Sequence, residues 1–235
     1  RRTDPDRAAH GYGAFAVDER EAREAMALTG GMVTMIDDAV GRILGALSES
    51  GLSEETIVAF TSDHGDYMGD HGLLLKGPLH LQSLLQVPMI WHDPRLPHRQ
   101  TPIESLHSSI DIAASVLGAA GVDPYNGLQG RSFLDALKGE PEPARTLLIE
   151  EDAQDAHFGF ETAPRIRTLM TQRYRLTIYG RSGHAELFDL HEDPHELVNR
   201  WACSGYARVR AQLMEELALV EMEAADTSPW PVYMA

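Results

Sequence analysis

Residues Thr56 to Thr61 form an almost uninterrupted apolar and β-branched run, TIVAFT, which leads directly into the polar triplet Asp63-His64-Gly65. Such runs are typical of strands that are covered on both faces, as in α/β sheets. A second run of the same kind occupies residues 87–92. Ligands in open α/β sheets bind beyond the carboxyl ends of strands, so the pattern predicts polar groups gathered where the first strand ends.

Two amphipathic segments flank these strands and are predicted to be helices. Apolar residues recur at helical spacing over residues 18–50, and a second helix is expected over residues 106–120. Gly51 is placed to end the first helix as a left-handed cap. Gly30 and Gly31 cost that helix about 1 kcal/mol each, which predicts a kink or a close contact there. Helix, strand, loop, strand, helix is the order of an open α/β sheet.

The sequence pattern changes after residue 121. A stretch rich in glycine and proline, with a short helix near residues 132–138, precedes four strand-like segments and a final helix: 146–150, 165–172, 173–179, 185–190 and 205–224. Apolar alternation in the third of these segments favours an antiparallel sheet with one buried face. We therefore expect two domains. Residues 1–125 would form part of an open sheet flanked by helices, and residues 126–235 a smaller α+β subdomain with a helix packed on an antiparallel sheet.

Composition excludes several classes of partner. The formal net charge of −16 opposes a nucleic acid, whose phosphates need lysine and arginine. No apolar run approaches the roughly 18 residues of a membrane span. The single cysteine, Cys203, excludes an intrachain disulfide and a multi-cysteine metal cluster, and it leaves the compartment undecided. A small anionic substrate remains compatible with the charge, because one metal ion and one lysine reverse the potential locally.

Asp63 and His64 are the first candidates for chemistry. A carboxylate oxygen and an imidazole nitrogen together suit Mg, Mn, Ca or Zn. Adjacent strand residues point to opposite faces, so both can reach one ion only if the backbone leaves the strand, and Gly65 permits that turn. The alternative is an ordinary strand-to-loop turn without a ligand.

Lys76 is the next candidate, since it is the one charged residue in the stretch Leu-Leu-Leu-Lys-Gly-Pro. Its ammonium could stabilise the oxygens of a sulfuryl or phosphoryl group, and a solvated loop lysine is the alternative. His71 and His80 lie on either side and could donate to a substrate or protonate a leaving group. Asp66 and Asp70 are expected to be solvated loop carboxylates or turn formers. Ser108 and Ser109 follow a histidine, but proximity in sequence does not make a catalytic triad.

Several of these segments, taken together and in order, resemble the sulfatase branch of the alkaline phosphatase superfamily. They are IDDAVGRILGALSESGL, TIVAFTSDHGD, GDHGLLLKGP, VPMIWHDP, SIDIAASVLGAAGV, GLQGRSFLDAL and the late pair RTLMTQRYRLTIY and AELFDLHEDPHELVNRW. The resemblance covers about residues 25–220. It implies that Asp63 and His64 are two ligands of one divalent ion (Ca, Mg or Mn) and that Lys76 contacts the sulfate oxygens.

The resemblance also implies a nucleophile that these residues do not supply. Sulfatases carry a Cys-x-Pro-x-Arg segment whose cysteine becomes formylglycine, and no such segment occurs in the 235 residues. Cys203 lacks the proline and arginine and lies after the metal pair, so formylglycine is expected upstream.

Three functions follow as hypotheses. The parent protein would hydrolyse sulfate esters, with a small anionic sulfate or phosphate ester as substrate. The same scaffold could instead act on a phosphonate monoester or phosphodiester. The third is a truncated, non-catalytic remnant that acts in binding or assembly. We expect the segment alone to be inactive and prone to oligomerise, because an open sheet without its partner strands exposes apolar edges.

Overall fold

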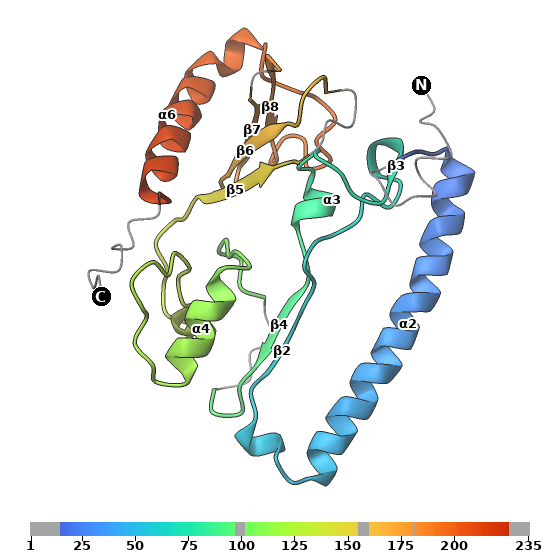
Figure 1. Ribbon diagram of the computed structural model, residues 1–235, viewed down its shortest axis with the longest axis vertical. Coiled ribbons are helices and arrows are strands. Elements are labelled where there is room, and N and C mark those ends of the chain that lie inside the picture. Colours follow the sequence, from blue (N-terminus) through green and yellow to red (C-terminus); the bar gives the residue numbers. More distant parts are fainter. Residues whose placement is uncertain (1–14, 97–101, 155–159, 181, 226–235) are drawn as a thin grey trace, which may run out of the picture. The chain divides into compact units, whose positions relative to one another are not determined.

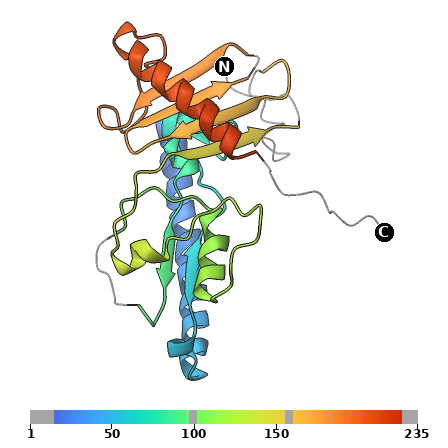
Figure 2. The ribbon, with the colours of Figure 1, turned by 90° about the vertical axis from the view of Figure 1, so that its left-hand side faces the viewer.

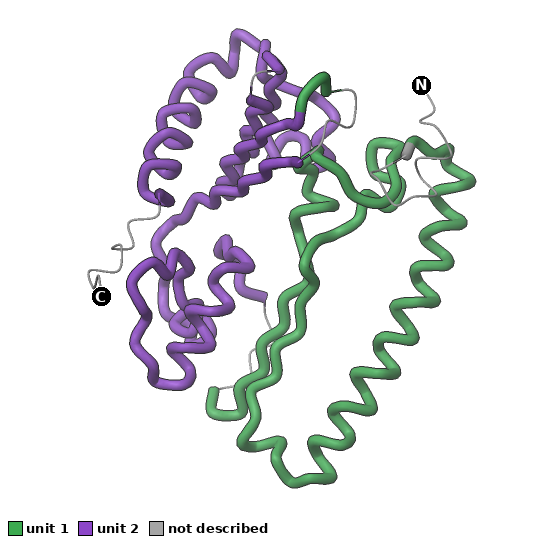
Figure 3. The backbone as a smooth tube through the Cα atoms, viewed as in Figure 1, with its two compact units in different colours: residues 1–97, 155–162 green, residues 98–154, 163–235 purple. Residues whose placement is uncertain are grey.

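The computed structural model describes residues 15–96, 102–154, 160–180 and 182–225. The chain forms two compact units, which are residues 1–97 with 155–162, and residues 98–154 with 163–235 (Figure 3). The two units are sets of residues that contact one another, and such sets do not test where a domain begins or ends. The predicted domain boundary at residue 125 therefore stays a prediction.

The first unit begins with a long helix. Strand β1 (Phe15–Ala16) leads into α2 (Glu19–Glu49), the longest helix in Figure 1. Asp18 accepts a hydrogen bond from the backbone of Glu21, whose side chain accepts from the backbone of Asp18, and this capping box fixes the start of α2. Gly51 has a φ of 73°, as expected for a left-handed residue after the helix.

The expected consequence of Gly30 and Gly31 is not found. Helix α2 runs through both positions without interruption, and nothing described lies within 4 Å of a Cβ placed on either glycine. Helix propensity over the other residues is sufficient to carry the helix through the weak middle.

The remainder of the first unit holds a two-stranded sheet and a loop that is tied to β1. The 3₁₀ turn η1 (Ser53–Glu55) precedes β2 (Val58–Thr61), which pairs antiparallel with β4 (Met89–His92). Between them come the 3₁₀ turn η2 (Asp70–Gly72), β3 (Leu73–Leu74), which pairs with β1, and the short helix α3 (Gln82–Leu85). The strands were predicted to be covered on both faces, and this is wrong for the chain: Ile90 is 60% exposed and Phe60 38%. Among the described residues, no third strand extends this two-stranded sheet, and these side chains stay partly exposed.

The second unit opens with two helices, α4 (Asp111–Ala119) and α5 (Leu134–Lys138). The first of them starts five residues later than the sequence predicts. The cause is Asp111, whose backbone N–H donates to the Ser108 carbonyl while its carboxylate accepts from the Ser108 N–H at 2.8 Å. These bonds form a turn that precedes the helix.

A four-stranded antiparallel sheet forms the rest of this unit, with the order β5 (Leu147–Asp152), β6 (Arg165–Met170), β7 (Tyr174–Tyr179), β8 (His184–Asp189). After the 3₁₀ turn η3 (Ser204–Tyr206), helix α6 (Ala207–Glu223) lies across one face of the sheet, as Figure 2 shows. The predicted α/β class, with an antiparallel sheet and a packed helix, is confirmed.

The core of this sheet lies under α6. Leu169, Leu176 and Leu187 are aligned on three neighbouring strands, and each is fully buried against Leu213 and Leu217 of the helix. The alternation seen in the sequence places these leucines on one face, because successive strand residues point to opposite sides. Burying each leucine stabilises the unit by about 1.5–3 kcal/mol.

Candidate active site

The site begins where β2 ends. The Asp63 carboxylate accepts a hydrogen bond from the His64 backbone N–H at 3.0 Å, and Ser62 donates its hydroxyl proton to the His64 carbonyl at 2.9 Å. These bonds turn the backbone out of the strand. The two side chains that would point to opposite faces of a strand can therefore lie together.

Gly65 is needed for a different reason from the one the sequence suggested. Its φ is not positive, so it does not supply a left-handed turn. Its N–H donates to the Leu84 carbonyl at 2.7 Å, and a Cβ on Gly65 would lie 2.0 Å from the carbonyl oxygen of Ser83. Any side chain would therefore push α3 away from the end of β2.

The His64 ring is held in one orientation by its own loop. Nδ1 lies 2.7 Å from the Gly65 carbonyl oxygen, which can only accept, so Nδ1 carries the proton of the neutral ring. Nε2 is then left with a free lone pair. It lies 3.6 Å from Asp63 Oδ2 and 2.8 Å from Lys76 Nζ. The structure thus brings Asp63, His64 and Lys76 together, although Lys76 comes from a separate part of the loop.

Asp63 is suited to be an anionic ligand. Its side chain is 85% exposed. The hydrogen bond from the His64 backbone N–H is the main cause that holds the pKa of this carboxyl below its ordinary value. The carboxyl is therefore ionised at neutral pH, and its oxygens are open to solvent.

These two side chains fit part of a divalent metal site. An ionised oxygen and a neutral, correctly protonated imidazole nitrogen face one region of space, which is the donor chemistry that such an ion requires. Within the described ranges, no group of three or more histidine, cysteine, aspartate or glutamate side chains is arranged to hold an ion. A metal site built from such side chains of the described residues alone would therefore have at most two ligands.

The two flanking histidines lie in different surroundings. His71 is exposed in η2 and has a left-handed backbone, with φ of 52°. His80 is only 3% exposed. No described hydrogen bond or ion pair joins His71 to Asp63, His64 or Lys76. The catalytic roles suggested for His71 and His80 stay predictions.

A serine, a histidine and an acid meet in the second unit, at a place that the sequence did not indicate. Ser105 Oγ lies 3.1 Å from His107 Nε2, and Glu142 accepts from Ser105 and lies 3.2 Å from the same ring nitrogen. In a catalytic triad the acid holds the other nitrogen, Nδ1. His107 Nδ1 is instead buried without a hydrogen bond, 3.8 Å from Asp111. This arrangement joins two chain segments and lacks the geometry of a catalytic triad.

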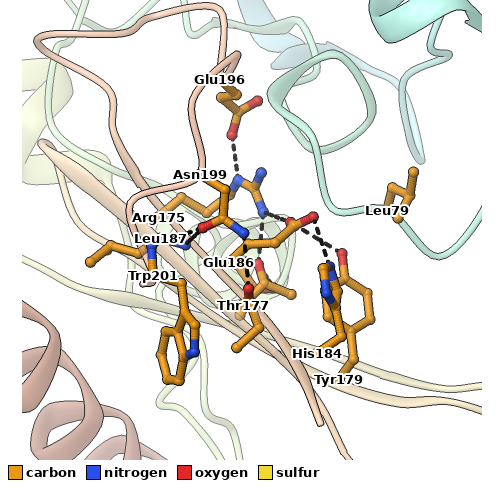
Figure 4. Close-up of polar contacts among 12 residues, drawn as sticks. Leu79, Arg175, Thr177, Tyr179, His184, Glu186, Leu187, Glu196, Asn199 and Trp201 are labelled. Carbon is orange, nitrogen blue, oxygen red and sulfur yellow. Dashed lines mark hydrogen bonds and ion pairs between the residues drawn. The ribbon is translucent and has the colours of Figure 1, made fainter. Parts of the chain in front are cut away.

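The late motif DLHEDPHELVNRW has a structural role. Glu196 accepts from the fully buried Arg175, which also lies 3.2 Å from Glu186, and Figure 4 shows these groups converging on the sheet. Asn199 accepts from the backbone of Leu187 at 3.0 Å and donates to the Ala185 carbonyl at 3.0 Å, which ties the loop to β8. The charged pairing is not visible in the sequence, because the partners are separated along the chain.

Comparisons with known proteins agree with this fold. A family model described as sulfatase matches residues 3–122, and one described as the C-terminal part of N-sulphoglucosamine sulphohydrolase matches residues 69–223. The chain belongs to the sulfatase family, and the resemblance seen in the sequence is confirmed.

The chain is similar to several individual proteins of this kind. It is 33% identical over 213 residues to a multifunctional alkaline phosphatase superfamily protein of Trinickia caryophylli, covering 85% of this chain and 40% of that protein. It is 28% identical over 213 residues to an arylsulfatase of Clostridium perfringens, covering 89% and 42%. The phosphonate monoester hydrolase structure of Agrobacterium radiobacter superposes with a TM-score of 0.71 at 29% identity, covering 84% and 41%. The chain spans about two fifths of the length of these proteins.

Proposed function

We propose that the full-length protein hydrolyses sulfate esters and that this chain supplies the part of the active site that binds the metal and the sulfate group. The observation that carries the proposal is the convergence on His64 Nε2, with Asp63 Oδ2 at 3.6 Å and Lys76 Nζ at 2.8 Å. A carboxylate, a neutral imidazole and an ammonium are the groups needed to bind a divalent cation next to an oxyanion.

In this proposal Asp63 and His64 hold the ion, with Ca, Mg and Mn as the candidates. When bound, such an ion withdraws charge from the ester oxygens as a Lewis acid. The lone pair on His64 Nε2 cannot serve both an ion and the Lys76 ammonium. If Nε2 held an ion, the Lys76 ammonium beside it would be available for the oxygens of the anionic substrate instead.

The nucleophile of the proposal lies outside the 235 residues. A formylglycine requires a Cys-x-Pro-x-Arg segment in this family, and the sequence contains none. The chain's own contribution is confined to binding the ion, orienting the ester and stabilising its charge.

The test is Asp63→Asn in the full-length protein. The variant keeps the size of the side chain and removes the anionic oxygen, so metal-dependent turnover of an aryl sulfate is expected to fall by at least about a hundredfold. Asp38→Asn on α2, far along the chain from the site, is the matched control and is expected to keep normal turnover. Near-normal turnover of Asp63→Asn across a metal titration contradicts the assignment.

Phosphonate monoesters and phosphodiesters are the second candidate substrates. The observation in their favour is that the similar structure from Agrobacterium radiobacter is a phosphonate monoester hydrolase. Sulfate and phosphonate esters present tetrahedral anions of similar shape to the same lysine and cation. Relative kcat/KM values on an aryl sulfate, a phosphonate monoester and a phosphodiester decide between the two readings.

A non-catalytic remnant is the third candidate. Mass spectrometry of tryptic peptides from the native protein distinguishes this hypothesis from the two hypotheses in which the protein is an enzyme. A formylglycine peptide in sequence preceding Arg1 supports the sulfatase. A natural chain that starts near Arg1 supports a role in binding or assembly.

A further inference from the structure

We infer that Asp66 is the residue that positions Lys76 beside His64. The inference rests on the proposed function, in which Lys76 binds the anionic oxygens of the ester. The sequence predicts that Asp66 is a solvated carboxylate or a turn former, and it indicates no contact between Asp66 and the segment that holds the lysine.

The first step is the contact between Asp66 and the residue before the lysine. One oxygen of its carboxylate, Oδ1, accepts from the Met68 N–H at 2.8 Å and from the Leu75 N–H at 3.0 Å. The second bond spans nine residues and closes the loop that separates Asp63 from Lys76. Hydrogen bonds to an ionised carboxylate are about twice as strong as those between neutral groups.

The second step concerns Tyr67, the next residue, which makes further hydrogen bonds within the same loop. Its N–H donates to the Leu75 carbonyl at 2.9 Å, so both backbone groups of Leu75 are fixed by consecutive residues. The Tyr67 hydroxyl also donates to the Leu79 carbonyl at 2.9 Å and accepts from the Leu79 N–H at 3.0 Å. Tyr67 is 1% exposed and packs with Leu81 and Leu84, which anchors the loop in a small core.

The third step is the backbone conformation that these contacts maintain. Leu75 has a φ of 66°, and Met68, which bonds to the same carboxylate oxygen, has a φ of 47°. A left-handed conformation costs a residue with a side chain about 1–2 kcal/mol, so it persists only where other contacts impose it. The two residues that donate to Asp66 are thus both strained. Without the carboxylate we expect Leu75 to relax to negative φ, which redirects the chain at Lys76.

The backbone conformation of Leu75 affects the distance between the Lys76 ammonium and the His64 ring. The ammonium reaches Nε2 at 2.8 Å from an exposed loop position, and the side chain of a free lysine samples many rotamers. Fixing the backbone just before Lys76 limits where its ammonium can lie. Asp66 is therefore a positioning residue, which acts on the ester through Lys76 and does not touch the ester itself.

The experiment compares Asp66→Ala with Asp66→Asn in the full-length protein. Asparagine keeps an acceptor oxygen at the same position, whereas alanine removes it. For Asp66→Ala we expect kcat/KM for an aryl sulfate to fall at least about tenfold, as for other misplaced catalytic groups, and Asp66→Asn to recover most of that loss. Asp70→Ala in the same loop is the matched control, because no described hydrogen bond or ion pair involves its carboxylate, and it is expected to keep normal kcat/KM.

Two further measurements separate positioning from a loss of folding and from failure of the proposed function. Hydrogen exchange of the peptide that contains Leu75 is expected to accelerate in Asp66→Ala alone, with the thermal unfolding midpoint reported beside it. The ¹³C-methyl NMR signal of reductively methylated Lys76, identified by its absence in Lys76→Arg, is expected to move to the position of a free lysine in Asp66→Ala alone.

The outcomes are distinct. A wild-type protein that turns over no ester defeats the proposed function, and the exchange and NMR measurements still decide the positioning role. Unchanged Lys76 signal and Leu75 exchange in Asp66→Ala overturn the inference, as does an Asp66→Asn variant that is as impaired as Asp66→Ala.

Discussion

Hydrogen bonds shift the pKa of individual side chains in this protein, and Asp189 is the clearest case. Asp189 has a fully buried carboxylate, which accepts from Arg173 through Nη2 at 2.8 Å and Nε at 3.0 Å and from the Tyr206 hydroxyl at 3.2 Å. Arg173 is the main cause that holds the pKa of Asp189 below its ordinary value. A carboxyl whose pKa is depressed in the folded state stabilises the fold above its unfolded pKa, and this contribution is lost as the pH falls through the folded pKa.

Asp189→Asn is therefore expected to lower the free energy of unfolding by about 1–3 kcal/mol at neutral pH. The difference from wild type should shrink as the pH falls below about 4, where the carboxyl of the unfolded chain begins to protonate, and should disappear as the pH falls through the lower folded-state pKa. Urea denaturation at several pH values measures both effects. Asp135→Asn is the control, because its pair with Lys138 is largely exposed and solvent screens it, so its loss should change stability little. A difference that stays constant down to strongly acidic pH contradicts this account.

At the scale of elements, two glycines illustrate how packing decides what a residue does. Gly65 lies where the end of β2 meets α3, and Gly30 lies in the middle of α2 with nothing described near it. Gly65 follows a predicted strand and Gly30 lies within a predicted helix, and for both positions the sequence analysis considered the conformational freedom of glycine. Only the tertiary structure shows that Gly65 is required by a neighbouring carbonyl and that Gly30 is not required by any described contact.

The same substitution should accordingly have opposite effects at the two sites. Gly65→Ala places a Cβ against the backbone of Ser83, which cannot move as a flexible side chain can, and we expect a loss of about 1–3 kcal/mol in stability. Gly30→Ala in the 235-residue chain should gain about 0.5–1 kcal/mol from better helix propensity. Chemical denaturation of both variants measures whether the free energy of unfolding falls or rises relative to wild type. A Gly65→Ala variant as stable as wild type would contradict this expectation, because it would mean that α3 can move without loss of stability.

At the scale of the whole molecule, apolar surface is left uncovered. No described residue of α2 is buried, and several of its large apolar side chains are more than half exposed, including Leu28 at 68% and Met35 at 71%. No helix in the described part of the chain is long and apolar enough to cross a membrane. The chain spans about two fifths of the length of its relatives. Exposed apolar side chains in this number favour association with another apolar surface.

We therefore expect the 235-residue chain by itself to associate at micromolar concentrations and to be inactive on sulfate esters. Light scattering after size-exclusion chromatography measures the mass. Met35→Lys together with Ile43→Lys should reduce association if the α2 face is responsible, whereas Asp37→Lys, a charge change on the same helix, should not. An active, monodisperse monomer refutes this expectation.

The sequence by itself determined the element types, the antiparallel sheet with its packed helix, and the family. These follow from local periodicity and from motifs that stand in a fixed order, and both can be read along the chain. It also selected Asp63, His64 and Lys76 as candidates, because their residue types match a cation and an anion.

Only the tertiary structure decided which groups meet. The contact between Lys76 and His64, the hydrogen bond from Leu75 to Asp66 and the buried pair of Arg175 and Glu196 all join residues that are separated in the sequence. The protonated nitrogen of the His64 ring depends on the orientation of the adjacent Gly65 carbonyl, which the sequence does not give. Periodicity constrains which face of an element a side chain occupies. It says nothing about the loop geometry and long-range hydrogen bonds that bring one polar group within reach of another.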